Sequence, residues 1–242
     1  MEPDITTFII ALTSCANGSL YHQDCSIHED MERDVNKHSM LRDVQIRATL
    51  INFYGKSGQL DNCWKIFGDE KLEKETSTWN AMIHALGRNG QIDRAMEMYR
   101  HMDSCGVGVD GKTYIALLNA LSHVGEAEQA YLLWRTQITD DGIKYDRFVM
   151  TSLVDCFTRK GMLQEALNRV MEYEEKTNGC DHIMWMTLLN GCSKHPGHSI
   201  ERVIVDEYAK RFDSVSVDHN QSKQIDLSEL ESAMSKLRCV RI

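Results

Sequence analysis

Six glycines recur along this chain at intervals of 32 to 40 residues, and this periodicity constrains the fold more than any other feature. They are Gly18, Gly58, Gly90, Gly125, Gly161 and Gly197. Before Gly90, the apolar stretch Trp79–Leu86 has helical spacing, and glycine is the usual residue where a helix ends with a positive φ angle. A second amphipathic stretch follows, with apolar residues three or four positions apart. One such helix–turn–helix unit is too small to bury both stripes, so neighbouring units are expected to stack.

The same pattern divides most of the chain into repeats. We place them at residues 5–43, 44–75, 76–110, 111–146, 147–181 and 182–212. Residues 1–212 then form a repeat array, and residues 213–242 form a separate C-terminal segment. Only two prolines occur, and β-branched residues do not alternate with polar ones over any length. The predicted fold is therefore all-α, an α-solenoid whose stacked helix pairs wind into a superhelix with a concave face.

Composition argues against several classes of protein. No apolar run approaches the length that spans a bilayer, so we expect no membrane association. The net charge of -9 argues against binding polyanions through overall charge, although it leaves a local basic groove open. The eight cysteines form no Cys-x-x-Cys pair and are expected to be reduced, mostly buried thiols. The first residues show no targeting peptide, so we expect either a fragment or a non-plant relative of the family identified below.

Several segments resemble the pentatricopeptide repeat family, over roughly residues 3–212. TSTWNAMI with the terminal Asp110 matches the standard repeat, whereas EPDITTFIIALTSCANG and KYDRFVMTSLVDCFTRKG resemble the flanking repeat types of the plant (PLS) branch. MWMTLLNGCSKH is similar to the extension motif that follows the last repeat. The resemblance implies sequence-selective binding of single-stranded RNA. It also implies a role in RNA processing in a mitochondrion or plastid, with a processing or editing protein recruited in trans.

In this family, the fifth and the last residue of a repeat face one RNA base. Carried over to this sequence, the base-reading positions are Met186, which is unpaired, and the pairs Ala48/Glu75, Asn80/Asp110, Ile115/Asp146 and Thr151/Asp181. By the family's code, Asn with Asp reads uracil and Thr with Asp reads guanine, which implies a core RNA sequence of U-x-G. Short amide and hydroxyl side chains suit the Watson–Crick edge of a base. They also suit the start of a helix, and this purely structural role stays open.

Two further positions in each repeat carry an expectation of contact with RNA. Basic residues stand two positions before four of the six glycines and three positions before Gly197, at a position that lies near the phosphates in the family: Lys56, Arg88, His123, Arg159 and Lys194. One cation per repeat could follow an RNA backbone, yet basic residues also offset the dipole at a helix C-terminus. The second residue of each repeat should sandwich the base, and these residues are Gln45, Ser77, Lys112, Phe148 and Ile183. Only the last two suit that role well.

Catalytic and cofactor motifs are missing from the sequence. Many plant-type relatives end in a cytidine deaminase domain, which needs His-x-Glu and a Cys-x-x-Cys pair around zinc. Neither motif occurs here, so we expect a chain that is not an enzyme and requires no cofactor. Residues Gly106–Gly111 spell GxGxxG, but they follow a helical stretch rather than a strand. We therefore expect no dinucleotide site.

The C-terminal segment contains a stretch with the ligand spacing of an EF-hand calcium loop. Its candidate calcium ligands are Asp218, Asn220, Ser222, Gln224 through its backbone carbonyl, Asp226 and Glu229. Lys223 stands where the loop normally has glycine, and no clean entering helix or partner loop is visible in the sequence. The competing interpretation is a polar linker that leads into a helix with a capping box of Ser228 and Glu231.

Two other functions stay open at this point. The repeats could form a protein-binding scaffold of the tetratricopeptide kind, although those repeats keep a period of about 34 residues and typically carry a proline. Alternatively, the C-terminal segment could make the chain a calcium-responsive adaptor.

Overall fold

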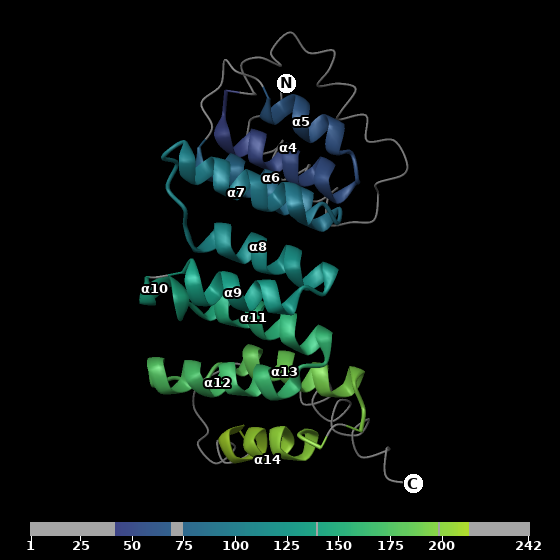
Figure 1. Ribbon diagram of the computed structural model, residues 1–242, viewed down its shortest axis with the longest axis vertical. Helices are drawn as coiled ribbons and strands as arrows, with labels where there is room; N and C mark the ends of the chain where they lie inside the picture. Colours follow the sequence, from purple (N-terminus) through teal and green to yellow (C-terminus); the bar gives the residue numbers. More distant parts are fainter. Residues whose placement is uncertain (1–41, 69–74, 139, 198, 213–242) are drawn as a thin grey trace, which may run out of the picture. The chain divides into compact units, whose positions relative to one another are not determined.

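The computed structural model describes residues 42–68, 75–138, 140–197 and 199–212. Over these residues the chain is a succession of helices without a strand, and the all-α prediction is confirmed (Figure 1). The chain divides into two compact units, Met1–Val124 and Gly125–Ile242. Within the described part, no helix is both long and apolar enough to cross a membrane.

In the first unit, the first helices of successive pairs stack on one another. The helices are α4 (Val44–Lys56), α5 (Leu60–Phe67), α6 (Thr76–Arg88), α7 (Ile92–Ser104) and α8 (Gly111–Val124). Helix α6 packs on α4 and on α8, while α5 and α7 pack against the first helices (Figure 1). The fully buried side chains of this unit include Ile46, Ile51, Met82, Ile83, Leu86, Met102 and Leu117. The apolar stripe of each pair is therefore buried against the next pair.

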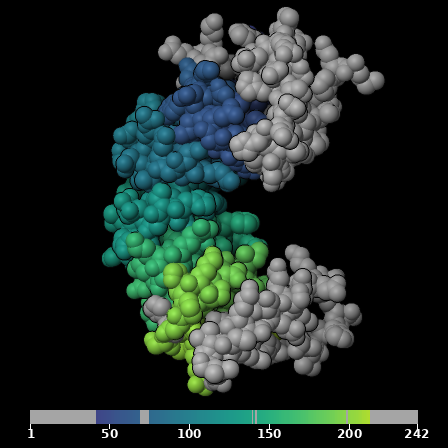
Figure 2. Space-filling model, turned by 90° about the vertical axis from the view of Figure 1, so that its right-hand side faces the viewer, coloured from purple at the N-terminus to yellow at the C-terminus, as the bar shows by residue number. Residues whose placement is uncertain are grey.

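The second unit follows the same plan with one insertion. Its helices are α9 (Ala127–Thr136), α10 (Asp141–Lys144), α11 (Arg147–Lys160), α12 (Leu163–Thr177), α13 (His182–Lys194) and α14 (Glu201–Phe212). Helix α11 packs against α9, α12 and α13, and α14 packs on α13. The sequence colours follow one another in bands within each unit, so neighbours in sequence are neighbours in space (Figure 2). The insertion is α10, a single turn whose Lys144 carbonyl accepts a hydrogen bond from the indole of Trp134.

Small residues allow the first helices to approach one another closely. A Cβ atom added to Gly55 of α4 would lie 2.5 Å from the Cβ of Ala85 in α6. At Gly87 of α6, an added Cβ would lie 2.2 Å from the Cβ of Ala120 in α8. The second unit repeats this contact between Gly191 of α13 and a threonine of α11. The contacts α4–α6, α6–α8 and α11–α13 therefore each include a helical glycine, and a larger residue there would force the neighbouring atoms to move.

Four of the glycines that mark the repeats follow the carboxyl ends of first helices as expected, whereas α13 ends before Gly197, with His195 as its cap. Gly58, Gly90, Gly125, Gly161 and Gly197 all have φ angles between 73° and 91°, and the sixth marker, Gly18, lies outside the described residues. Asn89, just before Gly90, adds a link between repeats. Its side-chain nitrogen donates hydrogen bonds to the carbonyl oxygens of Gly55 in α4 and Ala85 in α6, at 2.8 and 2.7 Å. Both carbonyl groups also accept backbone hydrogen bonds, from Gly58 and Asn89 respectively, so the Asn89 side chain adds a second donor at each helix end.

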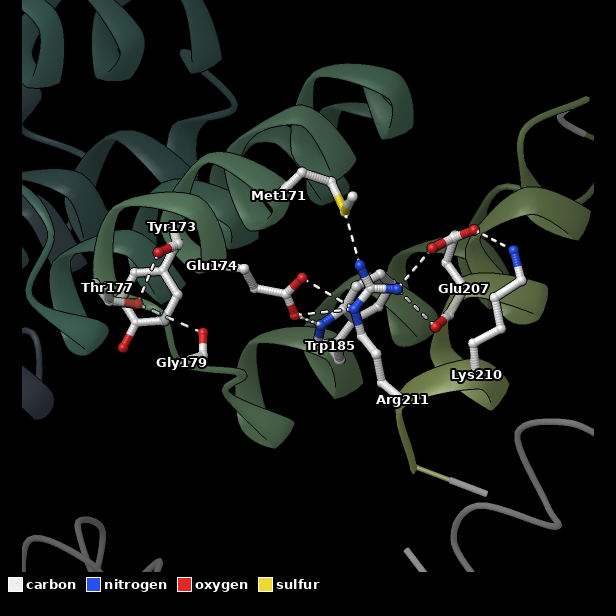
Figure 3. Close-up of polar contacts among 9 residues, drawn as sticks. All are labelled: Met171, Tyr173, Glu174, Thr177, Gly179, Trp185, Glu207, Lys210 and Arg211. Carbon is white, nitrogen blue, oxygen red and sulfur yellow. Dashed lines mark hydrogen bonds and ion pairs between the residues drawn. The ribbon is translucent and has the colours of Figure 1, made fainter. Parts of the chain in front are cut away.

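A polar cluster fastens α14 to α12 and α13 (Figure 3). The guanidinium of Arg211 in α14 pairs with Glu174 of α12 at 2.9 Å, and it lies over the ring of Trp185 in α13 at 4.8 Å. The indole of Trp185 donates to the same carboxylate at 2.8 Å, and Glu207 completes the cluster through an ion pair with Arg211 at 2.6 Å. The side chains of Arg211 and Glu174 are only 21% and 16% exposed, so their pairing is partly shielded from solvent.

The described cysteines fit the sequence-based expectation. Cys63, Cys156 and Cys192 are buried, and burial raises the pKa of Cys63 to about 11 and that of Cys192 to about 12. Cys105 and Cys180 are exposed near the ends of second helices, so three of the five described cysteines are buried, in line with the expectation of mostly buried thiols. Cys105 directly follows α7, and Cys180 lies three residues after the end of α12. Both therefore stand where the chain leaves a helix pair.

Candidate nucleic-acid interface

The residues expected to read bases all stand one turn inside a first helix. Each is the fifth residue of its helix, and in chain order they are Ala48, Asn80, Ile115, Thr151 and Met186. The acids expected to act with them stand just before a first helix instead. Asp146 and Asp181 cap α11 and α13 by accepting hydrogen bonds from backbone N–H groups. Helix capping therefore falls to the acids, and Asn80 and Thr151 are not helix-starting residues.

Asn80 and Asp110 are joined directly, although 30 residues separate them in the chain. The side-chain nitrogen of Asn80 donates a hydrogen bond to Oδ1 of Asp110 at 3.0 Å. The same carboxylate oxygen accepts from the backbone N–H and the hydroxyl of Thr113, at 2.9 and 3.0 Å. The backbone N–H of Asp110 donates to the Thr113 hydroxyl in return, which completes a reciprocal cap on α8. One carboxylate thus fixes the start of α8 and the side chain of Asn80.

The ionisation of Asp110 determines how the Asn80 amide is turned. Partial burial raises the pKa of this carboxyl, but the hydrogen bonds from Thr113 and Asn80 and the charge of Lys112 outweigh it, so the pKa lies below its ordinary value. An ionised carboxylate only accepts hydrogen bonds, so the NH₂ group of Asn80 must face it. The amide oxygen then points elsewhere. It is buried and accepts no hydrogen bond from the described residues, so it is an acceptor with unused capacity.

The pair Thr151 and Asp181 is arranged differently. The hydroxyl of Thr151 donates to the carbonyl oxygen of Arg147, one turn earlier in α11, at 2.6 Å. Asp181 uses Oδ1 to cap α13, through the backbone N–H of Met184 at 3.0 Å. Its Oδ2 lies 3.3 Å from Nε of Arg147. Arg147 therefore contacts both predicted base-reading side chains, Thr151 through its backbone carbonyl and Asp181 through its guanidinium.

The remaining predicted pairs are not brought together by any such bond within the described residues. Ala48 is half-buried in α4, and Glu75 is exposed at the start of α6, where its side chain makes no capping hydrogen bond. Ile115 lies half-buried in α8 of the first unit, whereas Asp146 caps α11 in the second unit. Met186 is half-buried in α13. Neither an alanine nor an isoleucine side chain offers a hydrogen bond, so these positions can contribute shape alone.

The second residues of the repeats share one property, which is exposure. Gln45, Ser77, Lys112, Phe148 and Ile183 are all exposed at the amino ends of first helices. Phe148 and Ile183 are 58% and 53% exposed, which is unusual for large apolar side chains. Helix α11 packs on α13, so both belong to the same pair of stacked helices in the second unit. They provide apolar surfaces on which a flat ring can stack.

The five basic residues before the glycines lie at or next to the carboxyl ends of first helices. In the first unit, three of them act electrostatically on His84 of α6, a residue that the sequence analysis did not single out. Burial and the charges of Arg88, Lys56 and His123 together lower the pKa of His84. In the second unit, Arg159 is partly neutralised by Asp155 at 2.7 Å, and Lys194 is the last residue of α13.

Two residues at this surface escaped the sequence analysis, and only one could have been found. His84 stands four positions before Arg88, so helical spacing places both on one face of α6. Arg147 is an ordinary residue at the start of a helix, and nothing in the sequence indicates that it reaches Asp181. The candidate calcium ligands Asp218, Asn220, Ser222, Gln224, Asp226 and Glu229 lie outside the described residues.

Sequence comparison gives the repeats a known counterpart. The model of the PPR (pentatricopeptide repeat) family matches residues 74–123, and the model of the PPR repeat matches residues 48–69 and 148–174. One pentatricopeptide repeat-containing protein of Arabidopsis thaliana is 31% identical over 206 residues, which cover 85% of this chain and 26% of that protein. Another, whose name adds the word mitochondrial, is 33% identical over 147 residues, covering 60% of this chain and 23% of that protein. The chain thus spans about a quarter of the length of these relatives.

Comparison with solved structures agrees on the fold. The chain resembles the pentatricopeptide repeat protein PPR10 crystallised in complex with an 18-nt psaJ RNA element. The TM-score is 0.60 at 18% sequence identity, and the match covers 98% of this chain and 38% of that chain. This likeness establishes the helical-repeat solenoid as the fold class.

Proposed function

We propose that this chain, which carries pentatricopeptide repeats, binds single-stranded RNA with one base facing each repeat. The observation that carries the proposal is the hydrogen bond from Asn80 to Asp110, because it gives a half-buried amide one defined orientation. A residue that served only to stabilise a helix would not need a second residue to fix the direction of its amide. The RNA seen in the PPR10 complex, whose protein shares the fold, supports the same ligand class.

The orientation of Asn80 favours uracil. With its NH₂ group turned toward Asp110, the amide presents its oxygen as an acceptor and keeps a second N–H as a donor. Uracil offers the complementary pattern, an N3–H donor flanked by carbonyl oxygens. Cytosine has an acceptor at N3, which would face the amide oxygen and repel it. The Asn80 oxygen is a buried acceptor without a partner in the free chain, so it must become accessible on RNA binding before a donor from uracil can satisfy it.

The second unit is proposed to read guanine through Thr151 and Asp181. Both side chains offer oxygen acceptors, and guanine presents two neighbouring donors, N1–H and N2–H, along its Watson–Crick edge. Phe148 and Ile183 supply exposed apolar surfaces for stacking, which contributes about 1–3 kcal/mol per base in single-strand binding. The repeats that contain Ala48 and Ile115 would select weakly. The proposed recognition sequence is accordingly U-x-G.

The basic residues are proposed to follow the phosphates. Lys56, Arg88 and His123 all act electrostatically on His84 in the first unit, so their charges act in one region despite the acidic composition of the chain. Such a local group of cations attracts a polyanion where the overall charge does not. The same positions at helix carboxyl ends also suit the helix dipole, and the two roles are compatible.

The cellular role is proposed by analogy with the longer relatives, because this chain spans about a quarter of their length. We place the function in organellar RNA processing, in a mitochondrion or plastid, on repeats of the plant type. Catalysis would come from a partner protein in trans. Calcium binding by the C-terminal loop is a separate proposal, to be tested by titration.

Selection from a random RNA pool tests the proposed function. The chain is expected to enrich RNAs that contain U-x-G, and the selection is run both with calcium and with a chelator. Enrichment that depends on calcium would assign a role to the C-terminal loop. Enrichment of no sequence in either condition would contradict RNA binding, and a protein-binding scaffold would then be the better account.

A further inference from the structure

Arg147 lies in contact with the side chains that are proposed to read guanine. Its Nε lies 3.3 Å from Oδ2 of Asp181, and its guanidinium carbon lies 4.9 Å from the ring centre of Phe148. Its backbone carbonyl accepts the hydroxyl hydrogen of Thr151. One residue therefore contacts the predicted stacking ring, the predicted carboxylate and the predicted hydroxyl at the same time.

The guanidinium of Arg147 has the same recognition chemistry as the edge of guanine. In both groups a flat carbon carries neighbouring N–H donors, which match a carboxylate, and in both the plane can stack on an aromatic ring. In this structure both carboxylate oxygens of Asp181 already have a partner: Oδ1 caps α13, and Nε of Arg147 lies 3.3 Å from Oδ2. An arriving guanine must therefore compete with Arg147 for the space and the charge at Oδ2.

We propose that Arg147 is an internal substitute for guanine, which holds the Thr151–Asp181 site until an RNA base with two matching donors displaces it. The inference rests on the proposed function. Guanine donates hydrogen bonds to Asp181 in place of the ion pair that Arg147 gives up. Adenine presents an acceptor beside its amino group, so it cannot replace that ion pair and Arg147 stays in place. Any base that binds this site must first displace Arg147, so Arg147 weakens the binding of every base, including guanine.

The geometry makes this exchange inexpensive. The side chain of Arg147 is 44% exposed, so it can move into solvent, whereas Asp181 is 12% exposed and remains fixed by its cap. Exposed ion pairs are weak. Removing the competitor is therefore expected to raise affinity by about two- to fivefold, in keeping with the measured strength of such pairs.

The other base-reading pair provides an internal comparison. The residue of α6 that corresponds to Arg147 is Thr76, whose hydroxyl donates to the carbonyl of Gly108 at 3.1 Å. Asp110 binds Asn80 directly and has no arginine in that place. The variant Arg147→Thr gives the second site the residue of the first. Arg94→Thr removes one positive charge from α7, where the Arg94 side chain donates a hydrogen bond to the side chain of Gln91, and serves as the charge control.

Binding of three RNAs to these variants tests the inference. The RNAs carry guanine, adenine or cytosine at the position that faces residues 147–181, and circular dichroism verifies the fold of each variant. We expect Arg147→Thr to bind the guanine RNA two- to fivefold more tightly, to bind the other two as before, and Arg94→Thr to show no such gain. In NMR spectra of the unaltered chain, the Nε–H signal of Arg147 should shift on addition of the guanine RNA and not of the adenine RNA.

The outcomes separate this inference from the proposed function. If the unaltered chain binds RNA but Arg147→Thr binds all three RNAs more weakly, Arg147 is a phosphate ligand and the inference is wrong. Unchanged affinity for the guanine RNA is equally contradictory. If the unaltered chain binds none of the RNAs, the proposed function fails and the inference fails with it.

Discussion

The side-chain nitrogen of Asn80 lies 3.0 Å from the carboxylate of Asp110, which connects the first helix of one repeat to the start of the next. The contact has two consequences. It orients an amide at a surface that RNA is proposed to reach, and it ties that amide to a carboxylate that also caps α8. Stability and recognition therefore depend on the same ionised group.

The first prediction concerns the pH dependence of this contact. The pKa of Asp110 is lower in the folded chain than its ordinary value, because the hydrogen bonds from Thr113 and Asn80 outweigh the opposing effect of burial. A carboxyl with a lowered folded-state pKa stabilises the fold above its unfolded-state pKa and loses this contribution as pH falls through the folded-state value. Asp110→Asn should therefore be less stable than the unaltered chain at pH 7, and the difference should shrink on acidification. Urea unfolding at a series of pH values measures it. A difference that stays constant down to pH 2 would contradict the assignment.

The second prediction concerns the close approach of α6 and α8. Gly87→Ala places a methyl group within 2.2 Å of the Cβ of Ala120 and 3.1 Å of its Cα, so the backbone must move. The expected loss in the free energy of unfolding is about 1–3 kcal/mol, the usual cost of overpacking. Gly108→Ala is the matched control, because no atom lies within 4 Å of its added Cβ. Thermal or urea unfolding compares the two variants, and equal stability would refute the steric argument.

The third prediction concerns the cluster that holds α14. Arg211→Ala leaves Glu174 without its cation and removes the group that lies over Trp185, so the free energy of unfolding should fall by about 1–3 kcal/mol. Lys210→Ala is the control, since the Lys210 side chain is 67% exposed and such surface pairs contribute little. Urea denaturation followed by tryptophan fluorescence measures both. A larger loss for Lys210→Ala than for Arg211→Ala would show that the cluster does not fasten α14.

The fourth prediction concerns His84. Burial and three neighbouring cations lower its pKa in the free chain. A bound phosphate would offset those cations and raise the pKa, so RNA binding should take up a proton and strengthen as pH falls from 7.5 toward 5.5. His84→Gln should flatten this dependence without abolishing binding. The measurement is the dissociation constant across that pH range at fixed salt. The same pH slope in His84→Gln would place the phosphates elsewhere.

Much of the fold was predictable from the sequence because its signals are local. A glycine that must adopt positive φ and an apolar stripe of helical period both lie within a few residues, and Gly58, Gly90, Gly125, Gly161 and Gly197 all behave as expected. The close contact of Gly87 with Ala120 was not predictable, because it joins residues from different repeats. The single turn α10 and the exposure of Cys105 and Cys180 also depend on details of the connections between helices.

The candidate site was predictable only as far as the family resemblance reaches. The resemblance pointed to Asn80 with Asp110 and to Thr151 with Asp181 as equivalent pairs. The structure makes them different, because Asp110 bonds to Asn80 whereas Asp181 bonds to Arg147. An arginine at the first position of a helix has many available partners, and its choice depends on where the next first helix packs. That information arises only when α11 and α13 are in place.

The most direct test of the account is the base preference of Asn80→Thr. Binding is measured for RNAs that carry uracil or guanine at the position facing residues 76–110, with the rest of the RNA unchanged. The unaltered chain should prefer uracil, and the variant, which combines threonine with Asp110, should shift its preference toward guanine. Discrimination of this kind is worth about 1–3 kcal/mol for a well-placed side chain, or roughly a tenfold change in relative affinity. If both proteins bind the two RNAs with the same relative affinity, Asn80 does not read a base and the central claim is wrong.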